Sequence, residues 1–269
     1  MLNNKIDFAV IFMVKNANPN GDPLGGNRPR TTSDGLGEVS DVCLKRKIRN
    51  RLQEMGEKIF VQSDEFCNDG EKSLSDRYKA FINGKKNDKE EVAKKVCEEW
   101  IDVRSFGQVF AFKKNDSIDE VSLGIRGPVT IQSAFSVEPI IVESIQITKS
   151  VNSETTKNGV KSADTMGMKH RVNKAVYVTY GSINPQLAEK TGFSEEDSNK
   201  IKKALITLFE NDESSARPSG SMEVINVIWF KHNNKFGQYS SSIVHKSVEV
   251  DKEGNIKINK LDGLTPEIA

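Results

Sequence analysis

The sequence predicts an α+β protein with a ferredoxin-like (RRM-like) core, in which two helices back a four-stranded antiparallel sheet. Two observations carry this prediction: segments rich in Val, Ile and Phe recur along the chain, and two amphipathic segments stand between them. In chain order the strong elements are strand, helix, strand, strand, helix, strand. The 269 residues suffice for one large core with insertions, so we expect a single domain over 1–269.

The first expected strand is 6–15 (IDFAVIFMVK), because its nearly continuous apolar character is typical of a buried central strand. The next segment, 16–30, holds three prolines, three glycines and four asparagines, a composition that predicts a loop and excludes regular structure. This loop is unusually long for a link from a strand to a helix.

Caps and periodicity predict two amphipathic helices. Ser40 is expected to cap a helix that runs to about Gly56. Ser194 begins a capping box, and the three acids at 195–197 suit the positive end of a helix dipole. The predicted buried positions are Leu44, Ile48, Leu52 and Met55 in the first helix and Ile201, Ala204, Leu205 and Leu208 in the second.

Apolar segments with β-branched and aromatic residues predict the remaining strands. They are 105–112, 125–135 with Gly127-Pro128 near its start, 171–183, 223–231, and a shorter edge strand over 243–250. Of these, 223–231 (EVINVIWFK) is expected to be the last buried strand.

Two stretches are interpreted as insertions on this core. Residues 57–103 are charged, and short helices are expected near 74–82 and 88–100. Residues 145–170 contain little that could be buried, which indicates a protruding hairpin or loop. We place the insertions at about 57–103 and about 138–170.

Several classes of protein are disfavoured by what the sequence lacks. The three cysteines form no CxxC pair and the three histidines no HExxH motif, so neither a disulfide framework nor a metal site is expected. The apolar run Phe8–Val14 is too short to span a membrane, and we expect a cytoplasmic protein. Phosphate-binding, nucleophile-elbow and dinucleotide glycine motifs are also missing.

The loop 16–30 and the helix behind it carry the first candidate site. Guanidinium forks, amide side chains and backbone N–H groups suit phosphate oxygens and sugar hydroxyls. The candidates for contact with a nucleic-acid backbone are Asn18, Asn20, Arg28, Arg30, Lys45, Arg46 and Arg49. A connecting loop and a solvated helix face are the alternatives that the residues leave open.

Two further places add candidates. Arg104 and Arg126 each stand near a glycine that would allow a ligand backbone to approach, and a simple strand-end turn explains each equally well. The basic triplet at 169–171 lies beside two methionines, which could wedge between bases while the cations hold phosphates. The candidates from this segment are Met166, Lys169, His170 and Arg171. A loop whose methionines pack its own base is the alternative.

An enzyme would need carboxylates near the loop. Asp22 and Asp34 lie in or near it, and a pair of acids could bind a magnesium ion for phosphodiester cleavage. Asp41 is better explained as a residue that complements the helix dipole. No histidine stands near these acids, so we expect neither a catalytic residue nor a metal or other cofactor.

Several blocks of sequence resemble one family. The run VKNANPNGDP at 14–23, continued by NRPR at 27–30 and DVCLKRKIRN at 41–50, resembles the Csd/Csh-type backbone subunit of CRISPR Cascade complexes. Further similar blocks are DVRSFG at 102–107, RGPV at 126–129 and TMGMKH at 165–170. The blocks AEKTGFSEED at 188–197 and FEND at 209–212 look like the type I-C branch. The resemblance covers most of residues 6–250.

The resemblance implies an RRM-like palm of the RAMP superfamily, with a finger-like insertion at 57–103 and a thumb-like hairpin or loop at 138–170. Such subunits are non-catalytic, bind CRISPR RNA (crRNA), and present it for pairing with target DNA in antiviral defence. The implied partners are crRNA, target DNA through the guide duplex, further copies of the chain in a helical filament, and other type I-C subunits. Two other hypotheses stay open: a metal-dependent RAMP endoribonuclease using Asp22 or Asp34, and a filament-forming protein without nucleic acid.

The charge balance is compatible with an RNA-binding subunit. The formal net charge is only +1, which by itself argues against binding through bulk positive charge. Cations nevertheless gather at 28–51 and 169–171, and acids at 189–213, where we expect a neighbouring subunit to meet them. A subunit that stacks on its own copies needs both signs on separate faces.

Overall fold

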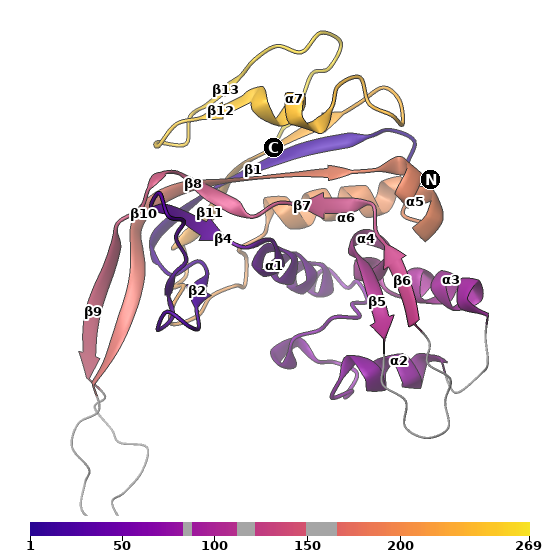
Figure 1. Ribbon diagram of the computed structural model, residues 1–269, viewed down its shortest axis with the longest axis horizontal. Coiled ribbons are helices and arrows are strands. Elements are labelled where there is room, and N and C mark those ends of the chain that lie inside the picture. The colour runs from indigo at the N-terminus through magenta and orange to yellow at the C-terminus, as the bar shows by residue number, and fades with distance from the viewer. Residues whose placement is uncertain (83–87, 112–121, 149–165) are drawn as a thin grey trace, which may run out of the picture.

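The computed structural model describes residues 1–82, 88–111, 122–148 and 166–269. A mixed α+β architecture surrounds one large antiparallel sheet with the strand order β14-β11-β1-β10-β8-β4, and β7 and β9 also pair with β10. In Figure 1 the helices α1 and α6 lie along one side of this sheet, and α7 with the β12–β13 hairpin lies on the other. The β9–β10 hairpin projects away from the body.

The sheet strands have the following bounds: β1 Ile6–Ala17, β4 Leu36–Val39, β7 Val129–Ile131, β8 Ala134–Pro139, β9 Val142–Thr148, β10 Met166–Ile183, β11 Met222–Lys231 and β14 Glu267–Ile268. Smaller two-stranded sheets pair β2 (Gly21–Asp22) with β3 (Arg28–Pro29), β5 (Gly107–Ala111) with β6 (Ser122–Arg126), and β12 (Val248–Val250) with β13 (Ile256–Ile258). The helices are α1 Asp41–Glu54, α2 Leu74–Ile82, α3 Lys89–Glu99, α4 Ile101–Phe106, α5 Pro185–Thr191, α6 Glu195–Ile206 and α7 Ser241–Lys246, with a 3₁₀ turn at Asp64–Phe66.

β1 is the central strand, as its apolar run predicts. It pairs antiparallel with β10 on one side and with β11 on the other. Alternate side chains enter two cores: Phe8, Val10 and Phe12 face the core under α1 and α6, whereas Ala9 and Ile11 face the core under α7. Because both faces are covered, the strand is apolar throughout.

Both predicted amphipathic helices are confirmed. The Ser40 side chain accepts the Cys43 N–H at the start of α1, and Leu44, Ile48 and Leu52 are buried. At the start of α6 the reciprocal capping box between Ser194 and Asp197 is formed. The buried face of α6 is the expected one: Ile201, Ala204, Leu205 and, just beyond the helix, Leu208.

The stretch after α1 has its own small core, built on Phe60, Trp100 and Phe110. The helices expected near 74–82 and 88–100 are confirmed as α2 and α3. The strand expected over 105–112 is wrong at its start, because α4 runs to Phe106 and β5 begins only at Gly107. Gly107 has φ +78°, and a Cβ there would lie 2.3 Å from the Ile125 carbonyl oxygen, so glycine ends the helix and allows the close pairing with β6.

Two other strand predictions need correction. The segment 125–135 is not one strand: β6 ends at Arg126, and β7 and β8 belong to the central sheet. Pro128 lies at the break, where it has no N–H to continue a ladder. The edge strand expected over 243–250 begins as helix α7, in which the Ser247 N–H donates to the Ile243 carbonyl, and only β12 is extended. A short apolar run does not distinguish helix from strand.

The expected protruding hairpin is present in its two described arms. β9 pairs antiparallel with the first part of β10, from Met166↔Thr148 to Val172↔Val142. Residues 149–165, which complete the predicted insertion, lie outside the described residues. None of the described helices is long and apolar enough to cross a membrane.

Candidate nucleic-acid interface

The predicted loop folds back as the β2–β3 hairpin, and its asparagines serve the fold. Asn18 Nδ2 donates to the Asn27 carbonyl at 2.7 Å, and Asn20 Oδ1 accepts from the Ser40 N–H and hydroxyl at 3.0 and 2.9 Å. A Cβ at Gly21 would lie 1.9 Å from Asn27 Oδ1, so the turn closes tightly. Asn18 is buried and closes the hairpin, and half-buried Asn20 fixes the hairpin to Ser40 at the start of α1.

The two arginines of this hairpin reach its surface. Arg28 is exposed, and its Nη1 donates to the Ser144 hydroxyl of β9 at 3.2 Å. Arg30 lies 3.5 Å from Asp22 in a half-exposed ion pair. Both guanidinium groups keep donors directed to solvent, which a phosphate group can accept.

The cations of α1 differ in how far the fold already uses them. Lys45 pairs with Asp41 at 3.0 Å, one turn earlier, and stays half-exposed. Arg46 donates to the Val61 carbonyl at 2.7 Å, and burial together with the nearby Arg49 lowers its pKa. Arg49 donates to Asp102 at 2.9 Å and lies over the Phe106 ring. Of the three, Lys45 is the one with most freedom to meet a ligand.

Arg104 and Arg126 have different environments. Arg104 lies in α4, where two of its nitrogens contact Asp197 Oδ1 at 2.7 and 3.1 Å and a third donates to the Cys97 carbonyl at 3.3 Å. Burial raises the pKa of Asp197, but hydrogen bonds from Arg104 and Ser194 outweigh it and the net shift is downward. Arg126 is exposed at the end of β6, on the opposite side of α1 from the β9–β10 hairpin (Figure 1).

The β9–β10 hairpin sorts its side chains onto two faces. Cross-strand partners share a face, so one face carries Met166, Met168 and His170 opposite Thr148, Gln146 and Ser144. The other carries Lys169 and Arg171 opposite Ile145 and Glu143, and Arg171 donates to Glu143 at 2.8 Å. His170 Nδ1 lies 2.9 Å from Ser144 Oγ. Met166 and Met168 are 67% and 55% exposed, so the face that carries His170 also presents apolar surface to solvent.

Three residues of this candidate interface were not predicted from the sequence. Ser144 joins Arg28 to His170, and a lone serine in a polar segment carries no signal. Lys15 and Lys174 are exposed register partners of β1 and β10, between the loop hairpin and the projecting hairpin. Only the strand pairing places these two lysines opposite each other, so a prediction of the β1–β10 register would have been needed to find them.

The acid-rich segment 189–213 does not present the free negative face that its composition indicates. Most of its carboxylates already have a cation within the chain: Glu189 with Lys235, Glu195 with Lys231, Glu196 with Lys200, Asp197 with Arg104, Glu210 with Arg51, and Asp212 with Lys47 and Arg217. These contacts leave little uncompensated charge, and the sequence-based assignment of this segment to a neighbouring subunit loses its electrostatic basis.

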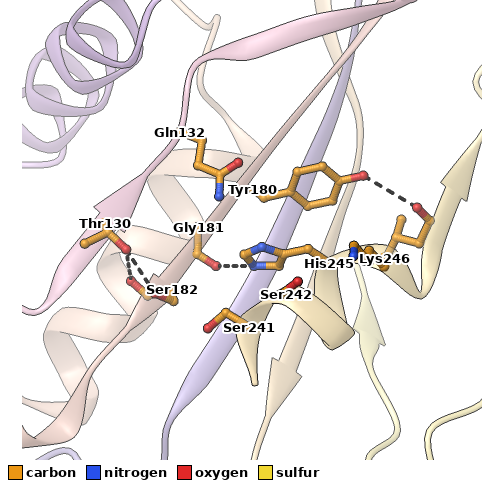
Figure 2. A pocket seen from close by; sticks show the side chains of 10 residues that line it. Thr130, Gln132, Tyr180, Gly181, Ser182, Ser241, Ser242, His245 and Lys246 are labelled. Carbon is orange, nitrogen blue, oxygen red and sulfur yellow. Dashed lines mark hydrogen bonds between the residues drawn. The ribbon is translucent and has the colours of Figure 1, made fainter. Parts of the chain in front are cut away.

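A hollow of about 440 Å³ lies far along β10, between that strand and α7 (Figure 2). On its wall the His245 ring stacks on Tyr180, and Nε2 donates to the Gly181 carbonyl at 3.1 Å. Burial lowers the pKa of His245, and the nearest carboxylate, Asp7, is 3.8 Å away. Asp7 is itself buried and bonded to His232 and Lys5, each at 2.8 Å. This cluster ties the C-terminal segment to β1.

The loop aspartates form no pair. Asp22 Oδ1 accepts the Leu24 N–H at 3.2 Å and contacts Arg30, whereas Asp34 is exposed and has no ion pair within the described part of the chain. Across the described ranges, no group of three or more His, Cys, Asp or Glu side chains is placed to hold a metal ion.

These features define an α+β protein with a large antiparallel sheet, a projecting hairpin, and a cation-bearing loop beside it. The chain belongs to the CRISPR-associated protein Cas7 family, whose model matches residues 4–265. This confirms the family-level resemblance seen in the sequence.

Individual relatives agree with this assignment. The chain is 24% identical, over 234 residues, to the CRISPR-associated protein Cas7 of Haloferax volcanii, a match that spans 81% of this chain and 67% of that protein. Among solved structures it is similar to a chain of a CRISPR RNA-guided surveillance complex in a pre-nicking state, with a TM-score of 0.52 and 16% identity over 88% of this chain and 81% of that one. This similarity shows a shared fold.

Proposed function

We propose that this chain is a non-catalytic, crRNA-binding backbone subunit of a type I-C CRISPR Cascade surveillance complex. It polymerises along the guide and presents it for pairing with target DNA in antiviral defence. The observation that carries the proposal is the contact of Arg28, on the loop hairpin, with the β9–β10 hairpin, which joins two cation-bearing segments into one surface. Family membership supports the proposal.

The chemistry of this surface suits an RNA backbone. The exposed or half-exposed cations along it are Arg28, Arg30, Lys45, Lys15 and Lys174, and Lys169 lies on the opposite face of the projecting hairpin. Side chains of this kind neutralise phosphates without reading bases, so the protein would hold any guide while base pairing selects the target. Met166 and Met168 supply apolar surface against which bases can pack. Arg49 and Arg104 are committed to carboxylates, and we leave them out of the proposed interface.

The proposed palm is a ferredoxin-like (RRM-like) core. Support comes from the neighbouring order β11-β1-β10-β8 together with α1 and α6 on one side, which matches a strand, helix, strand, strand, helix, strand arrangement. The insertion at about 57–103 would be the finger, and the β9–β10 hairpin would belong to the thumb at about 138–170. The proposed partners are crRNA, target DNA through the guide duplex, further copies of the chain, and the other type I-C subunits in the cytoplasm.

Co-purification tests the proposal. The chain would be expressed with its neighbouring subunits and a CRISPR array, and the purified assembly measured for RNA length, size and the ratio of absorbance at 260 and 280 nm. RNA of uniform length in a nuclease-sensitive assembly is expected. An assembly that contains no RNA and survives nuclease unchanged would instead support a filament-forming protein without nucleic acid.

A metal-dependent endoribonuclease is the second candidate, favoured by the exposure of Asp34 in the turn after the loop hairpin. Incubation of the assembled complex with guide-matched RNA and Mg²⁺ distinguishes it from the first. No periodic cleavage is expected for a scaffold, whereas periodic cuts that disappear in Asp34→Ala would establish the nuclease.

A further inference from the structure

Ser144 Oγ is the point at which the loop hairpin and the projecting hairpin meet. Arg28 Nη1 donates to it at 3.2 Å from β3, and His170 Nδ1 lies 2.9 Å away on β10. Arg28 and Ser144 are 116 positions apart in the sequence. One hydroxyl on β9 therefore joins the side chains of two cation-bearing segments, which also lie against each other where β3 meets β10.

The hydrogen atoms around Ser144 Oγ can be arranged in two ways. A guanidinium donates and never accepts, so Ser144 Oγ accepts from Arg28 in both. When His170 is neutral with Nδ1 unprotonated, the Ser144 O–H donates to Nδ1. When His170 is an imidazolium, Ser144 accepts from both neighbours, and its own O–H becomes free to donate to a ligand oxygen.

Resting on the proposed function, we propose that Ser144 is a positioning residue of the RNA interface. It holds Arg28 and His170 as one unit that meets a single phosphodiester group. Arg28 supplies the charge, and its hydrogen bond to Ser144 fixes where that charge stands on the projecting hairpin.

The charged groups around the unit are consistent with an anionic ligand. Asp22, opposite Arg28 in the β2–β3 pair, contacts Arg30 instead. On β9 and β10, Glu143 lies on the opposite face and pairs with Arg171, and Lys169 shares that face. In the part of the chain that the structure describes, no carboxylate forms an ion pair with Arg28 or His170. The unit is open to a phosphate from outside.

The test measures binding of an unstructured single-stranded RNA to the full-length chain at several salt concentrations. Ser144→Ala is expected to weaken binding about 2- to 10-fold, the effect of one net hydrogen bond. The slope of log affinity against log salt should become shallower by about 0.7, because Arg28 is no longer held against its phosphate. Ser144→Thr keeps the hydroxyl and should restore both quantities.

Two more variants make the outcome specific. Thr148→Ala is the control, because Thr148 lies on the same face of β9 as Ser144 and its hydroxyl has no partner among the described residues. This variant should bind RNA like the parent. His170→Ala removes the other partner of Ser144 Oγ and should lower RNA affinity about as much as Ser144→Ala does. If the parent binds RNA but Ser144→Ala matches it in affinity and salt slope, the positioning role is wrong and the proposed function stands. A parent that binds no RNA contradicts the proposed function itself.

Discussion

Arg104 of α4 and Asp197 of α6 form an ion pair that the fold almost entirely encloses, with side chains 16% and 6% exposed. Two guanidinium nitrogens contact the same carboxylate oxygen, and the Asp197 carboxylate also accepts the Ser194 N–H and hydroxyl at the helix cap. The pair therefore links α4 to the start of α6. In the structure, this ion pair holds the two helices together.

Arg104→Met should destabilise the protein without altering how it binds RNA. The variant leaves the Asp197 carboxylate buried without its cation, which costs about 3–5 kcal/mol in the free energy of unfolding. Urea denaturation measures this loss, and the salt slope of RNA affinity of the folded variant should not change. Arg126→Met, at an exposed cation, is the matched control and should unfold like the parent. A stable Arg104→Met with a reduced salt slope would return Arg104 to the RNA interface.

Lys174→Glu should raise stability while lowering RNA affinity. Lys15 and Lys174 are directly opposite each other in the β1–β10 pair, and replacing a like-charge pair with an opposite-charge pair stabilises by about 0.2–1 kcal/mol. The same change removes a cation from the proposed interface, so the salt slope should fall by about 0.7 or more. Thermal unfolding measures the gain in stability, and RNA titration measures the loss of affinity. Lys252→Glu, at an exposed site on the β12–β13 turn, should leave RNA affinity unchanged.

The three free thiols should react with an alkylating reagent in a fixed order. Cys67 is exposed, whereas burial raises the pKa of Cys43 and raises that of Cys97 to about 11. Because the thiolate is the reactive form, brief treatment at pH 8 should modify Cys67 first and Cys97 last. Peptide mass spectrometry gives the order. Fast modification of Cys97 in the native protein would contradict the packing of α3 on Phe60.

The loop before α2 should loosen in acid. Hydrogen bonds from the Arg77 guanidinium lower the pKa of Asp69 to about 2, and Arg77 also donates to the Phe60 carbonyl. A lowered carboxyl pKa means that this stabilisation is present above about pH 4 and is lost as pH falls toward 2. Hydrogen exchange of residues 62–73 should accelerate across that interval beyond the intrinsic rate. Asp69→Asn should exchange quickly throughout, with no such transition.

Much of the fold could be predicted from the sequence because its signals are local. The continuous apolar run of β1, the Ser40 cap and the Ser194 capping box each specify one element from neighbouring residues alone. The failures occurred where a short segment depends on distant partners. Residues 101–106 are helical because Gly107 turns the chain into β5, and 125–135 is divided because its two halves pair with different sheets.

The candidate site was predicted by residue type but not by geometry. Arg28 and His170 were both expected to contact a nucleic acid, yet only the folded chain shows that Ser144 joins them. Arg49 and Arg104 were predicted to contact nucleic acid as Arg28 was, but their ion pairs with Asp102 and Asp197 set them apart from Arg28. Charge in a sequence identifies candidates, and tertiary pairing decides which cations remain available.

β10 is one unbroken strand of 18 residues, about 60 Å at roughly 3.3 Å per residue, and it serves the hairpin at one end and the central sheet at the other. Its pairing with β1 fixes the register of the sheet end. A single-residue deletion between the two ends would therefore move Lys169 and Arg171 onto the face now held by Met168 and His170. Substitutions along this strand change one contact at a time, whereas a change in its length would invert a whole surface. Relatives of this chain should therefore vary in the composition of this strand far more than in its length.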